Sequence, residues 1–93
     1  MAILNFTNKK VAENNVWEAT AEVNNDFNIH IEVASQGNIE ICAGTINNGK
    51  KKVIYYAPEG DVLDQDFRAG VYPKYLRVRC WSQPTMGVIT EAE

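Results

Sequence analysis

Histidine and cysteine are scarce in this chain of 93 residues, which contains one histidine, His30, and two cysteines, Cys42 and Cys80. Transition-metal sites are usually built from three or four imidazole, thiolate or carboxylate ligands, so we predict no metal and no other cofactor. The cysteines do not form a C-x-x-C pair and fall in separate expected strands, which favours two reduced thiols over a disulfide. A chain of this length predicts one domain over residues 1–93.

The chain also lacks an excess of basic residues and any long apolar run. Nine Lys and Arg against twelve Asp and Glu give a net charge of -3, which argues against nucleic acid as a partner. No run approaches the roughly 20 apolar residues of a membrane helix, so no membrane contact is expected. The first six residues have neither the basic start nor the apolar length of a signal peptide, which predicts synthesis in the cytoplasm without secretion.

Side chains suited to catalysis are equally few. His30 alternates with Asn28 and Glu32 on the polar side of an expected strand, which is typical of a surface histidine. The sequence has one acidic stretch, which comprises Glu59, Asp61, Asp64 and Asp66. This stretch lacks the ligand spacing and glycine of an EF-hand loop, so a solvated acidic segment is favoured over a calcium site or a glycosidase pair. We predict that the chain is not an enzyme.

What the chain does contain is a two-residue alternation of apolar and polar side chains, which is typical of half-buried β-strands. Strands are expected over residues 3–7, 16–23, 27–33, 39–43, 53–56, 61–67, 74–81 and 86–90. Turns are expected at residues 24–26, 35–38 and 47–50, with a polar loop over 8–15 and a break at 57–61. The three lysines of residues 50–52 are expected to be a solvated, charged turn.

This pattern predicts an all-β protein in which the four central strands, from residue 16 to residue 56, pair in chain order as an up-and-down meander. Seven or eight short strands favour an antiparallel β-sandwich, either jelly-roll-like or immunoglobulin-like, with a small β-barrel as the alternative. The residues expected in the core are Trp17, Phe27, Ile29, Ile31, Ile39, Ile41 and Val78.

The strand expected over residues 74–81 carries an unusual outer side. Leu76, Val78 and Cys80 lie on one side of it. The other side, which we call the arginine face, comprises Tyr75, Arg77, Arg79 and Trp81. Three interpretations stay open: arginine stems covering apolar surface, a platform for glycans that Tyr55 or Tyr56 would extend, and a contact with another protein. We take the arginine face as the candidate interaction site.

Three segments resemble a known group of proteins. They are "WEATAEVNNDFNIHIEV" (residues 17–33), "VYPKYLRVRC" (71–80) and "PTMGVITEAE" (84–93). They resemble small β-sandwich proteins of gut Bacteroides-type bacteria, which are associated with phage and prophage structural gene clusters.

The resemblance implies a virion-associated structural protein that self-associates or binds other virion proteins, and it transfers no active-site residues. Under this hypothesis the chain is made in the cytoplasm and then enters a virion. A carbohydrate-binding or adhesin-like module is the alternative, with a glycan as its partner.

Overall fold

The computed structural model describes residues 2–70 and 73–92, and its regular structure is entirely β. The seven strands are β1 (Ala2–Ile3), β2 (Thr7–Val11), β3 (Asn14–Val23), β4 (Phe27–Gly44), β5 (Lys52–Phe67), β6 (Lys74–Cys80) and β7 (Pro84–Glu91). Within these described residues, no helix is long and apolar enough to cross a membrane.

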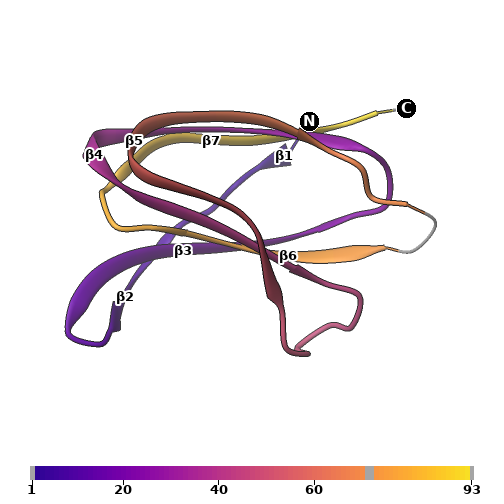
Figure 1. Cartoon of the computed structure of the whole chain (residues 1–93), viewed down its shortest axis with the longest axis horizontal. Coiled ribbons are helices and arrows are strands. Elements are labelled where there is room, and N and C mark those ends of the chain that lie inside the picture. The colour runs from indigo at the N-terminus through magenta and orange to yellow at the C-terminus, as the bar shows by residue number, and fades with distance from the viewer. Residues whose placement is uncertain (1, 71–72, 93) are drawn as a thin grey trace.

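All strand pairs are antiparallel and belong to one seven-stranded sheet with the order β1-β7-β4-β6-β3-β2, in which β5 pairs with β4. The sheet curls into a half-barrel (Figure 1). The structure therefore confirms the expected all-β antiparallel class, while the division into the two sheets of a sandwich is not confirmed.

The long hairpin of β4 and β5 makes the sheet curl. The first part of β4 pairs with β7 and the end of β5, whereas its last part pairs with β6 and the start of β5. Between these parts the register shifts, and Gly37 lies opposite Gly60. A Cβ atom on Gly37 would stand 3.1 Å from the Cβ of Ser82, so the close approach of the chain at this corner favours glycine.

Two expected interruptions are therefore wrong. Residues 35–38 were expected to form a turn and residues 57–61 a break, but β4 and β5 run through both segments. The two segments lie side by side in the hairpin, so the paired strands bend together as a bulge instead of ending. Turn-forming residues on one strand indicate a corner of the sheet when the paired segment of the neighbouring strand also contains turn-forming residues.

The order of pairing also differs from the expected meander. β3 pairs with β2 and β6, and not with β4, which follows it in the chain. Most of β2 lies in the expected polar loop over residues 8–15, and β2 joins β3 through a tight turn at Ala12 and Glu13, with φ of 48° and 68°. Two consecutive residues with positive φ are typical of a type I′ hairpin, but the usual Asn-Gly signal is missing here.

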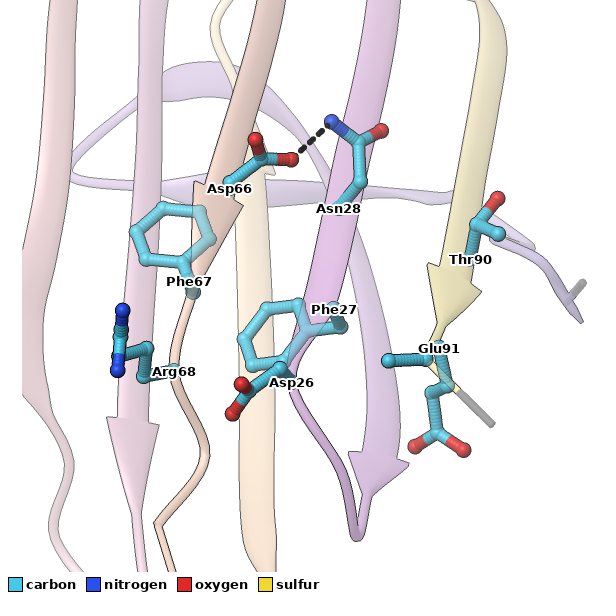
Figure 2. A pocket seen from close by; sticks show the side chains of 9 residues that line it. Asp26, Phe27, Asn28, Asp66, Phe67, Arg68, Thr90 and Glu91 are labelled. Atoms are coloured by element: carbon cyan, nitrogen blue, oxygen red, sulfur yellow. Dashed lines mark hydrogen bonds between the residues drawn. The ribbon is translucent and has the colours of Figure 1, made fainter.

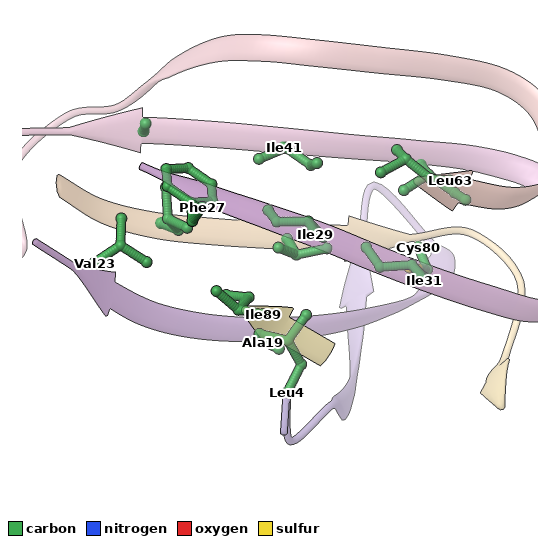
Figure 3. Close-up of a cluster of buried hydrophobic side chains, with 14 of the residues drawn as sticks. Leu4, Ala19, Val23, Phe27, Ile29, Ile31, Ile41, Leu63, Cys80 and Ile89 are labelled. Atoms are coloured by element: carbon green, nitrogen blue, oxygen red, sulfur yellow. The ribbon is translucent and has the colours of Figure 1, made fainter. Parts of the chain in front are cut away.

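The core lies inside the curve of the sheet. Six of the seven residues expected there are buried, namely Phe27, Ile29, Ile31, Ile39, Ile41 and Val78. Figure 3 shows side chains from β3, β4, β6 and β7 gathered in this cluster, together with Leu4 and Leu63. Trp17, the seventh, is only partly buried and packs against the cluster.

Candidate functional site

The arginine face lies on the outer, convex side of the sheet, away from the core. β6 alternates strictly: Leu76, Val78 and Cys80 are buried inside, and the residues between them point outward. β6 is a central strand with β3 on one side and β4 on the other, so its backbone is fully paired. The alternation expected along this strand is therefore confirmed over residues 74–80, and the neighbouring strands decide what its arginines contact.

Arg79 forms an ion pair with a buried glutamate. Its Nε donates a hydrogen bond of 2.8 Å to Glu18, which stands opposite Arg79 on β3, and Lys9 Nζ donates one of 2.8 Å to the other oxygen. Burial raises the pKa of Glu18, but these two hydrogen bonds outweigh it and hold the pKa below its ordinary value. The guanidinium of Arg79 is therefore part of the fold as well as of the outer face.

Arg77 has no such partner among the described residues. Its side chain lies over Cys42 of β4, with 3.5 Å between Nη2 and Sγ, and its Nε is buried without a hydrogen-bond partner. An unpaired buried donor costs free energy that a paired one does not. Two arginines that are two residues apart on one strand thus differ in environment, and only the tertiary structure shows it.

The remaining members of the arginine face are accessible in part. Tyr75, at the start of β6, is half-buried between Glu22 of β3 and Gly44 of β4. Trp81 follows the last residue of β6, is half-buried, and donates its backbone N–H to the carbonyl oxygen of Asn38. The structure therefore brings Tyr75, Arg77 and Arg79 into one row and places Trp81 at its end.

The face is wider than the sequence alone indicates. Tyr56 of β5 stands opposite Glu40, which in turn stands opposite Arg79, so Tyr56 extends the arginine face by two strands. Val53 stands opposite Cys42 on the same side, and both residues are about half exposed, at 51% for Val53 and 48% for Tyr56. Tyr55 lies on the inner side, where its ring meets Phe67 edge-on at 6.1 Å. The register between β4 and β5 therefore places Tyr56 on the outer side of the sheet and Tyr55 on the inner side.

The two cysteines, both in the described part of the chain, carry free thiols, as expected. Burial raises the pKa of Cys80 to about 12. Cys42 lies on the polar side of β4 as expected, yet it is buried beneath Arg77, and burial followed by a hydrogen bond to Glu40 raises its pKa.

We expect both thiols to react slowly in the native protein, with Cys42 faster than Cys80, because thiolate is the reactive form and Cys80 is the more deeply buried. Timed labelling followed by mass spectrometry measures the two rates separately. Labelling in urea is the control, where the two rates should converge. Faster labelling of Cys80 in the native protein would contradict the prediction.

His30 lies on the outer side of the other half of the sheet. Its Nε2 is 2.7 Å from Glu32 and its Nδ1 is 3.2 Å from Asp64 on β5. Ionised carboxylates only accept hydrogen bonds, so both ring nitrogens donate only when the imidazole is protonated. The hydrogen bond to Glu32 raises the pKa of His30 above 6.5, and the hydrogen bond to Asp64 adds to this effect. The pKa of Asp64 is lowered, first by the hydrogen bond that Asn28 donates and then by the one from His30.

An NMR titration of the imidazole is expected to give His30 a pKa above 6.5. Because the folded pKa is raised, the stabilisation is present below pH 6.5 and is lost as pH rises through the folded pKa. Asp64→Asn should lower the pKa of His30, whereas Asp61→Asn, on the same strand, should not. Equal titrations in the two variants would contradict this assignment. His30→Ala is expected to remain folded, since the side chain lies outside the core.

A pocket of about 410 Å³ lies where β4 begins and where β5 and β7 end (Figure 2). The rings of Phe27 and Phe67 stack in it, with 5.3 Å between their centroids. Two of its carboxylates are engaged in hydrogen bonds within the chain. Asp26 accepts a hydrogen bond of 3.1 Å from the backbone N–H of Ala69, and Asp66 accepts one of 2.9 Å from the side chain of Asn28. Phe27 is buried, so Phe67 is the ring that a ligand would reach.

Among the described residues, no group of three or more His, Cys, Asp or Glu side chains is arranged to hold a metal ion. The acidic residues expected to be solvated, Glu59, Asp61, Asp64 and Asp66, are all exposed along β5. Comparison of the chain with protein-family models, with curated proteins and with solved structures gives no match in any of the three.

Proposed function

We propose that this chain is a non-enzymatic structural subunit that acts through protein–protein contacts, of the kind that build a phage particle. The observation that carries the proposal is the outer side of β4, β5 and β6. There the exposed Val53 and Tyr56 lie on the same side of the sheet as the arginine face. Tyrosine, tryptophan and arginine are the residues enriched at protein interfaces.

The resemblance to β-sandwich virion proteins supports the same proposal, since such subunits work by covering one another's exposed surface. A half-barrel with apolar residues on its convex side gains stability when a neighbouring subunit removes that surface from water. Self-association and binding to other virion proteins both satisfy this requirement.

The proposal is tested by removing the apolar part of the surface. We expect the wild-type chain to form assemblies that Val53→Ser/Tyr56→Ser weakens, as measured by light scattering coupled to size exclusion over a range of concentrations. Ile3→Ser is the matched control, because Ile3 is 70% exposed on β1, in the other half of the sheet. Assemblies that the double variant leaves intact, or that both variants weaken equally, would contradict the role of this surface.

A glycan-binding module is the second candidate, and the pocket of Figure 2 favours it through the stack of Phe27 and Phe67 beside polar groups. Aromatic rings stack on sugar rings, and Arg68 at the rim would donate to hydroxyl groups. A glycan array with the wild type, Phe67→Ala and Trp81→Ala separates the two functions. Binding that either variant abolishes, with a monomeric wild type, would replace the structural proposal.

A further inference from the structure

β5 is a free edge of the sheet. It is 16 residues long and pairs with β4 on one side, and no backbone hydrogen bond joins its other side to any described residue. An edge strand of this length presents a row of unpaired N–H and C=O groups to which another strand can be added. The side chains along the edge then decide which strand is accepted.

The two ends of this edge differ in charge, although Arg68, exposed directly after β5, is a cation at the acidic end. Lys50, Lys51 and Lys52 lie where β5 begins, and Asp61, Asp64 and Asp66 lie in its second half. Within the described part of the chain, the three lysines, Asp61 and Asp66 take part in no ion pair. The charge of each end is therefore not neutralised inside the subunit.

The middle of the edge is blocked. Pro58 has no N–H to donate, and Glu59 adopts a φ of 54°, which interrupts the extended conformation. A strand added along β5 can therefore pair with its basic arm before Pro58 and its acidic arm after Gly60, but not with the corner between them.

We propose that the free edge of β5 pairs antiparallel with the same edge of a second copy, around a twofold axis at residues 58–60. In this arrangement the basic arm of each copy lies along the acidic arm of the other, and the two blocked corners meet on the axis. The inference rests on the proposed function, because it names a second copy of the chain as one partner in the assembly.

The charges select this arrangement over its competitors. Parallel pairing places lysines against lysines and aspartates against aspartates, and like charges directly opposite each other destabilise a pair of strands. A shift of register that joins two acidic arms meets the same repulsion.

The test is a charge exchange, measured by sedimentation velocity of the full chain over a concentration series at low salt. One variant reverses the basic arm, as Lys50→Glu/Lys51→Glu/Lys52→Glu. The other reverses the acidic arm, as Asp61→Lys/Asp66→Lys, and keeps Asp64 because it contacts His30. Each variant alone should dimerise at least about tenfold more weakly than the wild type.

An equimolar mixture of the two variants should restore the dimer, because the reversed arms then face opposite charges. A single chain that carries all five substitutions should restore it as well. Lys10→Glu is the control, since Lys10 is exposed on the opposite edge strand β2. Higher salt should weaken the wild-type dimer.

A wild type that assembles but ignores both reversals, or variants that do not recover on mixing, would overturn the inference while leaving the proposed function intact. A wild type that stays monomeric at every concentration would contradict both the edge pairing and the proposed function. If Val53→Ser/Tyr56→Ser abolishes assembly while the two charge reversals leave it unchanged, the contact lies on the convex surface and not on the edge.

Discussion

Ile31→Ala is expected to lower the free energy of unfolding by about 2–5 kcal/mol, because it deletes buried methyl and methylene groups and leaves a cavity that the sheet cannot fill. Ile31 is fully buried on β4, which is paired on both sides, so neighbouring strands are not free to move inward. A small domain has only about 5–15 kcal/mol of stability to lose. Urea denaturation at pH 7, followed by tryptophan fluorescence or circular dichroism, measures the change.

Ile3→Ala is the matched control, since the same atoms are removed from a residue that is 70% exposed on the edge strand β1. It should change the free energy of unfolding by less than about 0.5 kcal/mol. Similar losses in the two variants would mean that the curve of the sheet does not enclose the core as described.

Arg79→Met is expected to cost about 1–3 kcal/mol, whereas Arg77→Met should be nearly neutral. Removal of Arg79 leaves Glu18, whose side chain is 10% exposed, with Lys9 as its remaining charged partner. Removal of Arg77 deletes a guanidinium whose Nε has no hydrogen-bond partner. Methionine keeps the apolar contact of the arginine stem in both variants, so the difference between them isolates the ion pair.

The pH dependence gives an independent check on Arg79. The pKa of Glu18 is lowered in the folded protein, so its contribution is present above the ordinary value of 4.5 and is lost as pH falls through the folded pKa. Unfolding at pH 7 and pH 3 should therefore show a smaller loss on acidification in Arg79→Met than in the wild type. An equal loss in the two proteins would mean that Arg79 does not lower the pKa of Glu18.

This result also bears on how the arginine face is tested. Arg79 stabilises the subunit itself, so a loss of assembly in an Arg79 variant would combine a folding effect with a contact effect. Val53 and Tyr56 make no such contribution through an ion pair and are about half exposed, so they report on the surface alone. The register of β5, which the sequence did not reveal, supplies these two residues.

Alternation along the chain determined which side of β4 and β6 faces the core. Phe27, Ile29 and Ile31 are buried inside, and Arg77 and Arg79 lie outside, as the two-residue period requires. This information is local, because successive side chains of an extended backbone point in opposite directions whatever strand lies beside them. The all-β class and most of the core follow from it.

Only the tertiary structure decided which strands are neighbours, and with them the contacts of the site. Glu18 binds Arg79 because β3 lies beside β6, and Tyr56 joins the arginine face because β5 lies beside β4. Many strands with the same alternation satisfy the same pairing rules, so the choice among them depends on the packing of the whole sheet. The corner at Gly37 and Gly60 follows the same logic, since a turn-like segment remains in a strand when its partner bends with it.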